Sequence, residues 1–161
     1  MKNILVLLML SVLFVQCKKD GEDSTSNLIN LTASMSAKID GAAWSAITRV
    51  TTLQSGTFII TGTGSINGNN VMAITVFGQT AATYTLDPGT SQLGFAANFT
   101  PKVGASTDSI YTAYQGTVVL SSVDLANKKI SGTYNFKMRL TDMVTEINVT
   151  EGAFSNLSYT E

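Results

Sequence analysis

Histidine is absent from this chain of 161 residues, and Cys17 is its only cysteine. Without an imidazole side chain, neither a Ser-His-Asp nor a Cys-His catalytic group can form. Zinc sites built on histidine or on clustered thiols are excluded for the same reason. A single cysteine also has no partner for an intramolecular disulfide. We therefore expect no catalytic residues, no metal site and no cofactor.

Charged residues and proline are scarce too. Charged side chains make up 13% of the chain, about half the share found in an average soluble domain. The net charge of −1 offers no attraction to a polyanion, so no nucleic acid partner is expected. Pairs of carboxylates can hydrolyse glycosides, but the acidic residues of the later chain fall at predicted turns or on polar strand faces. We expect a protein that is not an enzyme.

The most distinctive segment that is present lies at the N-terminus. A short, positively charged start, Met1-Lys2-Asn3, precedes twelve residues, 4–15, that are apolar except for Ser11. As a helix this run would measure about 18 Å, too short for a hydrocarbon layer of about 30 Å. The pattern is typical of an export signal. The alternative, a buried core helix, fits poorly because the run has no polar face.

Leu13-Phe14-Val15-Gln16-Cys17 resembles a bacterial lipobox, although Gln16 stands where a small residue is usual. The resemblance implies cleavage after Gln16 and lipid attachment at Cys17, which would anchor the protein to a membrane. Several acyl chains on one residue would make that anchor effectively permanent, since each buried CH₂ contributes about 0.8 kcal/mol. The alternatives for Cys17 are a secreted protein with a free thiol, or an anchor that is not cleaved.

The segment after Cys17 is polar. Lys18-Lys19-Asp20-Gly21-Glu22-Asp23 resembles the signal that sends Bacteroidota lipoproteins to the outer face of the outer membrane, with Gly21 interrupting the acidic residues. The resemblance implies a lipid-anchored protein of the outer membrane that faces the cell surface; the alternative faces the periplasm. Residues 18–34 lack periodicity and predict a flexible linker. The expected organisation is a signal peptide (1–16), the lipidated cysteine and linker (17–34) and one domain (35–161).

The domain alternates apolar and polar residues with a period of two, most clearly over 129–141. This alternation predicts a strand with one face toward a core and one toward water. Similar strands are expected at 35–40, 47–53, 58–66, 72–76, 82–86, 94–100, 116–123, 146–150 and 153–159. Turn residues such as Asp40-Gly41 and Asp87-Pro88-Gly89 separate them. The expected fold is all-β: an antiparallel sandwich or partly open barrel of about nine strands.

Three stretches carry a second resemblance: "MSAKIDGAAWSA" (35–46), "ATYTLD" (82–87) and "KKISGTYNFKM" with "NVTEGAFSNLSY" (128–138 and 148–159). They are similar to a family of small Bacteroidota lipoproteins that is defined only as a domain of unknown function. The resemblance covers nearly the whole domain. It implies a β-rich fold and a lipoprotein context, and it supplies no catalytic residues.

The longest irregular stretch is expected at 101–115, where Tyr111 and Tyr114 are candidate binding residues for a carbohydrate or protein ligand. The alternatives are that they cap the edge of the core, or that 109–114 is another strand. Trp44 is expected in the core. The glycines of "GTGSING" (62–68) have the wrong spacing for a dinucleotide site and indicate close packing instead.

Two tripeptides, Asp23-Ser24-Thr25 and Asp108-Ser109-Ile110, resemble the Bacteroidota O-glycosylation pattern. The leading functional hypothesis is a non-catalytic binding or structural module that is anchored at Cys17. The alternative is a lipocalin-like barrel that holds a small apolar ligand. A ligand barrel needs an internal cavity of several hundred Å³, whereas the large inward residues expected near Tyr134 indicate a filled core.

Overall fold

A computed structural model describes residues 32–65, 69–90, 92–104, 106 and 109–161. The predicted signal peptide, Cys17 and nearly all of the predicted linker lie outside these residues. The described chain forms ten strands: β1 (Ser34–Ile39), β2 (Ala42–Gln54), β3 (Thr57–Ser65), β4 (Asn69–Val76), β5 (Thr83–Asp87), β6 (Gln92–Leu93), β7 (Phe95–Thr100), β8 (Tyr111–Asp124), β9 (Lys129–Arg139) and β10 (Glu146–Ser158). The described residues include no helix long and apolar enough to cross a membrane.

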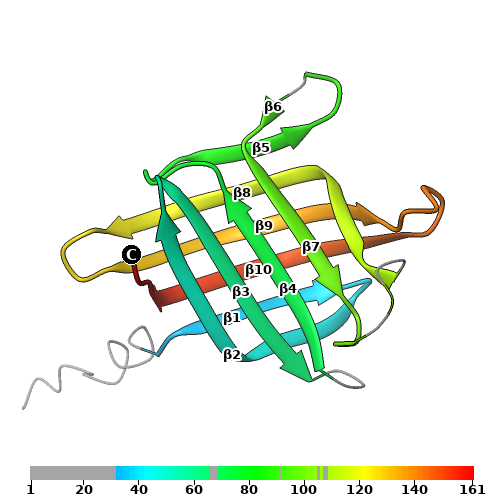
Figure 1. The fold of residues 1–161 in the computed structure, drawn as a ribbon, viewed down its shortest axis with the longest axis horizontal. Coiled ribbons are helices and arrows are strands. Elements are labelled where there is room, and N and C mark those ends of the chain that lie inside the picture. Colours follow the sequence, from blue (N-terminus) through cyan, green and yellow to red (C-terminus); the bar gives the residue numbers. More distant parts are fainter. Residues whose placement is uncertain (1–31, 66–68, 91, 105, 107–108) are drawn as a thin grey trace, which may run out of the picture.

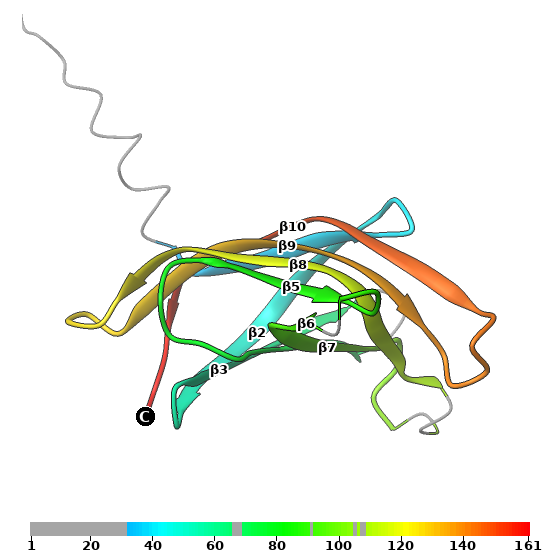
Figure 2. The same cartoon turned by 90° about the horizontal axis from the view of Figure 1, so that it is seen from above.

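Eight of the strands close into an antiparallel barrel, in the order β8-β7-β4-β3-β2-β1-β10-β9, with β9 pairing back onto β8. Strands β2, β3, β4 and β7 form one layer and β1, β10, β9 and β8 the other (Figures 1 and 2). The hairpin of β5 and β6 lies outside the barrel, because β5 pairs with β8 and β6 pairs with β5. The predicted all-β antiparallel fold is confirmed, as a barrel.

The barrel has one narrow seam. Strands β7 and β8 pair at only two positions, Asn98 with Thr112 and Phe99 with Tyr111. Beyond these pairs, β8 turns away from β7 and pairs with β5 over residues 116–119. This divergence gives the hairpin of β5 and β6 its place on the outside of the molecule.

Two tight turns fix the register of the first three strands. Asp40 and Gly41 have φ angles of 47° and 81°, and Ser55 and Gly56 have 48° and 78°. Two successive positive φ angles are the mark of the type I′ turn, whose twist matches that of the strands it joins. The predicted Asp40-Gly41 turn is confirmed, whereas Ser55-Gly56 was not recognised as a turn in the sequence.

The inward residues of the strands fill the barrel. On β9 the predicted alternation is confirmed, because Ile130, Gly132, Tyr134, Phe136 and Met138 are all buried. An eight-stranded barrel is just wide enough for side chains to fill its interior. Aromatic rings occupy much of this space: the Phe136 ring lies 5.2 Å from Tyr134 and 5.0 Å from Phe95, between centroids.

Large rings inside the barrel lie opposite glycines. Gly132 pairs with Phe154, and a Cβ atom on this glycine would stand 2.6 Å from the Phe154 ring. Gly152 stands in the same relation to Tyr134, at 2.4 Å. Small and large residues therefore complement each other across neighbouring strands.

Trp44 is buried in the core, as predicted, and is 1% exposed. Its indole nitrogen donates a hydrogen bond to Asn70 Oδ1 at 2.5 Å. A Cβ atom on Gly64 would collide with that nitrogen, and one on Gly62 would lie 2.9 Å from the far edge of the ring. The close packing predicted for these glycines is confirmed.

Two predictions about the strands are wrong. Residues 111–115 are not irregular, since they begin β8, which confirms the alternative of a strand at 109–114 for residues 111–114. Residues 146–158 form one strand rather than two. Both errors fall at β-bulges, which add a residue and shift the alternation. The register of β8 against β9 shifts at Tyr114. On β10 it shifts between Val149 and Gly152, where Glu151 has a φ of 51°.

The barrel has two ends. The Ser34 end carries the start of β1, the Ser55-Gly56 turn and the turn between β8 and β9; the Asp142 end carries the turn between β9 and β10 (left and right in Figure 1). Residues after β10 cross the Ser34 end, where Thr160 O accepts a hydrogen bond from Leu53 N at 2.8 Å and Tyr159 N donates one to Lys128 O at 3.0 Å. This crossing segment closes the Ser34 end over the core.

Candidate functional site

The two candidate tyrosines lie on different faces of β8. Tyr111 is partly buried and packs against the edge of the core, as one of the alternatives anticipated. Its outer edge borders a surface cavity of about 320 Å³ that Pro101, Lys102 and Leu140 also line. Tyr111 therefore combines packing with limited access from solvent.

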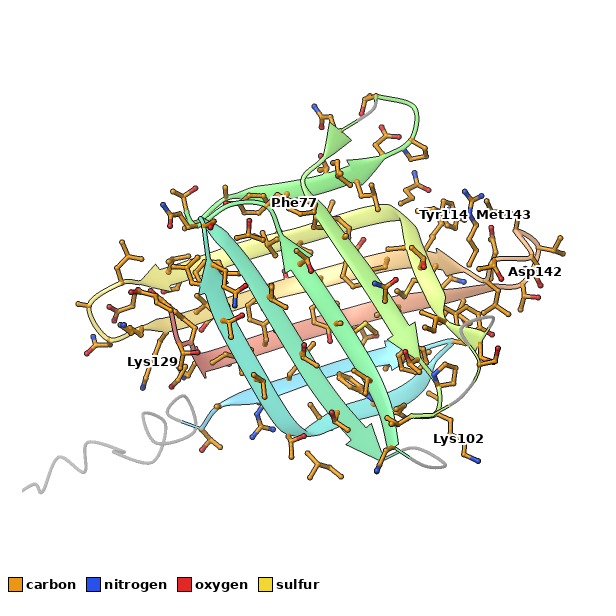
Figure 3. All side chains as sticks on the ribbon, in the orientation of Figure 1. Phe77, Lys102, Tyr114, Lys129, Asp142 and Met143 are labelled. Atoms are coloured by element: carbon orange, nitrogen blue, oxygen red, sulfur yellow. The ribbon has the colours of Figure 1, made fainter. Side chains whose placement is uncertain are left out.

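Tyr114 occupies the β-bulge of β8 and faces outward. The Arg139 guanidinium carbon lies 4.8 Å from the centroid of its ring, within the range of a cation–π contact. Burial raises the pKa of the Tyr114 hydroxyl, and a hydrogen bond with Glu146 and the negative charge of that residue raise it further, while the charge of Arg139 lowers it. Figure 3 shows Tyr114 next to Met143, and both line a cavity of about 250 Å³.

The two tyrosines therefore do not form one stacking platform, although Leu140 borders both of their cavities. Whether either binds a ligand stays a prediction. Cys17 and Asp23-Ser24-Thr25 lie outside the described residues, as does Asp108 of the second tripeptide, whereas its Ser109 is described and partly exposed.

A larger cavity, of about 540 Å³, lies on the outer face of β5, β8, β9 and β10. Strand register explains its shape. Leu86, Gly116, Phe136 and Val149 follow one another across the four strands. The side chains of Phe136 and Val149 are buried in the core, and that of Leu86 packs against it. The backbone of these four residues forms the floor of what we call the outer groove.

Polar residues on either side of this floor form two walls. The first wall consists of Thr85, Thr117, Asn135 and Thr150, and the second of Gln115, Lys137 and Asn148. Residues two apart on a strand are separated by nearly 7 Å, which sets the width between the walls. With strands about 4.8 Å apart, the floor runs about 14 Å across the sheet.

The hairpin of β5 and β6 closes one end of the outer groove through Asp87, Thr90 and Gln92. Thr85 Oγ1 donates a hydrogen bond to Gln92 Oε1 at 2.8 Å, which holds the hairpin against the first wall. An Asx turn, in which Gly89 N donates to Asp87 Oδ1 at 2.9 Å, shapes the tip of the hairpin. The arrangement makes a groove that is closed on the β5 side.

Gly116 keeps the floor of the outer groove open. Its φ of 151° and the 2.2 Å that would separate a Cβ atom from Asn135 O leave no room for a side chain. The backbone of β8 therefore approaches β9 closely at the centre of the groove. A glycine inside a strand often marks such a close approach.

The two walls differ in their hydrogen bonding. In the first wall, Asn135 Nδ2 donates to Thr117 Oγ1 at 2.8 Å. In the second wall, the exposed side chains of Gln115, Lys137 and Asn148 make no hydrogen bond or ion pair with any described residue. The second wall thus presents two amides and one ammonium group to solvent.

The outer groove could not be predicted from the sequence. Its residues come from four strands and one hairpin, so that only long-range pairing brings them together. The single local signal is the outward polar set of β9, Asn135 and Lys137, which the alternation of this strand places on the solvent face. No three His, Cys, Asp or Glu residues within the described ranges lie close enough together to hold a metal ion.

Comparison with known proteins gives one finding. No curated protein and no solved structure matches the chain. The model of the family described as a domain of unknown function (DUF6252) matches residues 31–158, a span that includes all ten strands. The chain, a closed β-barrel with a polar groove on its outer face, belongs to the DUF6252 family.

Proposed function

We propose that this protein is a non-catalytic binding module of the cell envelope, tethered to the outer membrane through a lipid on Cys17. The observation that carries the proposal is the combination of a filled barrel with a polar groove on its outer face. A ligand would therefore bind to the outer surface of the barrel. The closed barrel supplies the rigid framework that such a surface site needs.

The filled interior counts against the lipocalin-like alternative. Trp44, Phe58, Phe95, Tyr134 and Phe154 are among the largest fully buried side chains. They occupy the volume that a small apolar ligand would need inside a barrel of eight strands. The proposal therefore places ligand recognition on the exterior of the barrel.

The sequence supports the tether, and the position of β1 in the fold is compatible with it. The short apolar run and the lipobox-like residues 13–17 support export and lipid attachment. Seventeen residues, 18–34, follow Cys17, and a flexible chain of this length has a reach of about 20–25 Å. Because β1 begins at the Ser34 end, a lipid at Cys17 would leave the Asp142 end and the outer groove free.

Substitution of Cys17 tests the tether. We expect Cys17→Ala to leave the membrane fraction, or to accumulate as a longer unprocessed chain, while a Ser26→Ala control in the same linker fractionates and matures normally. Membrane fractionation followed by mass measurement of the mature chain provides the readout. If Cys17→Ala stayed in the membrane at the normal mature mass, lipid attachment at this residue would be disproved.

Protease treatment tests the orientation. A domain that faces the cell surface should be lost when protease is added to intact cells, and a periplasmic marker protein should survive the same treatment. Protection on intact cells with cleavage after lysis would establish the periplasm-facing alternative and reject cell-surface exposure.

A further inference from the structure

We propose that the outer groove binds a neutral, linear oligosaccharide, with the side chains of Gln115 and Asn148 as its principal contacts. This inference rests on the proposed function, because it names the ligand class of the same binding surface. It starts from the second wall of the groove, where both amides are exposed and make no hydrogen bond with any described residue. An amide both donates and accepts, as sugar hydroxyl groups do.

The charge of the groove favours a neutral ligand. Only Lys137 and Asp87 carry charge among the residues that line it, so the two charges balance formally. A nucleic acid or another polyanion needs several cations arranged along its path. The remaining polar side chains of the lining are hydroxyl and amide groups, which suit hydroxyl groups better than phosphates or carboxylates.

The shape of the groove favours a linear ligand. The floor runs across four strands for about 14 Å between walls nearly 7 Å apart, and the hairpin with Asp87 and Gln92 closes the β5 side. A volume of about 540 Å³ falls within the range of ordinary ligand sites. A short chain of sugar rings can lie along such a floor with its hydroxyl groups directed to both walls.

A protein partner is less well served by this surface. Interfaces between proteins depend on a few buried Trp, Tyr, Arg or large apolar anchors. The one aromatic residue in the lining, Phe136, points its ring into the barrel and is 2% exposed. The exposed large apolar side chains of the described chain, including Phe77, Leu93 and Met143, lie outside the lining.

The test uses the full chain, matured in cells and purified in detergent micelles. It is applied to an array of immobilised neutral, uronic-acid-containing and sulfated oligosaccharides. The affinity for the strongest ligand is then measured by calorimetry for three proteins: the natural protein, Gln115→Ala/Asn148→Ala and the control Gln54→Ala/Gln79→Ala. The control removes two exposed glutamine amides that do not line the groove.

We expect binding to neutral oligosaccharides only, a loss of affinity of at least tenfold in the groove variant, and an unchanged affinity in the control. The inference is overturned if no neutral oligosaccharide binds, if only charged ones bind, or if the groove variant binds like the natural protein. Membrane fractionation of Cys17→Ala reads out the tether separately, so failure of the ligand class is distinguishable from failure of the proposed function.

Discussion

At the scale of single residues, the barrel depends on glycines whose missing side chains make room for rings. Gly132 and Phe154 face each other on β9 and β10, as do Gly152 and Tyr134. The inward position of the aromatic rings could be predicted from the sequence, because the alternation of β9 places Tyr134 and Phe136 inside. The pairing of each ring with a glycine could not be predicted, because the partner of each glycine lies on another strand.

Gly132→Ala should destabilise the protein by about 1–3 kcal/mol, the usual cost of adding an atom to a well-packed core. Its Cβ atom would press on the Phe154 ring and on Val119 O, which belongs to the backbone and cannot turn away. Urea unfolding, followed by the fluorescence of buried Trp44, measures the change.

Gly89→Ala is the matched control for this substitution. Its Cβ atom would meet only Asp87 Oδ1, at 3.3 Å, on an exposed turn. Equal midpoints for Gly132→Ala and Gly89→Ala would show that the interior tolerates the extra atom, against the packing argument.

At the scale of elements, the sequence predicted strands well where alternation is uninterrupted and poorly where it is broken. Strand β9 was predicted nearly to the residue. At the start of β8 the sequence left a loop and a strand open as alternatives, because the bulge at Tyr114 and the glycine at 116 hide its period. Strand β6, of two residues, is too short to carry any period. The outer groove escaped prediction for a different reason: its walls exist only through pairing between distant strands.

The turn between β9 and β10 shows how a single carboxylate organises an element. Asp142 accepts hydrogen bonds from Thr145 Oγ1 at 2.6 Å, from Thr145 N at 2.9 Å and from Val144 N at 2.9 Å. These bonds favour the ionised form and hold the pKa of Asp142 below its usual value; the largest effect is that of the Thr145 hydroxyl. The conformation of this turn is therefore stabilised by the ionised form of the Asp142 carboxylate.

Because the pKa is lowered in the folded state, Asp142 stabilises the protein above the usual aspartate pKa of about 3.9. That stabilisation is lost as the pH falls through the lower pKa of the folded state. Asp142→Ala should therefore lower the urea unfolding midpoint at pH 7. It should also reduce the difference between the urea midpoints measured at pH 7 and at pH 3.

Asp142→Asn refines the comparison, because it keeps a carbonyl acceptor and removes the titration. Its midpoint at pH 7 should fall between those of the natural protein and Asp142→Ala. A dependence on pH in Asp142→Ala as steep as that of the natural protein would refute the role given to this carboxylate.

At the scale of the whole molecule, the closure of the barrel is uneven. Strands β8 and β9 pair at eleven positions, whereas β7 and β8 pair at two. Local opening is easiest where few backbone hydrogen bonds must break. The seam between β7 and β8 should therefore open at a lower free energy than the ladder of β8 and β9.

Native-state hydrogen exchange measures this difference. We expect the amides of Tyr111 and Thr112, beside the seam, to exchange at least tenfold faster than those of Thr117 and Val119, which lie at the centre of β8 and pair with β9. The rates should converge as urea approaches the unfolding midpoint. Equal protection of all four amides at low urea would mean that the barrel opens only as a unit.

The pairing of β1 with β10 determines when the barrel can close during synthesis of the chain. The register joins Ser34 to Ser155 and Ile39 to Val149. The barrel therefore cannot close between β1 and β10 before the ribosome has synthesised β10. Contacts between residues so far apart in sequence also form slowly once the chain is available. A growing chain of this protein therefore remains open until β10 has been made, and an open chain is the form that can be threaded through a narrow pore.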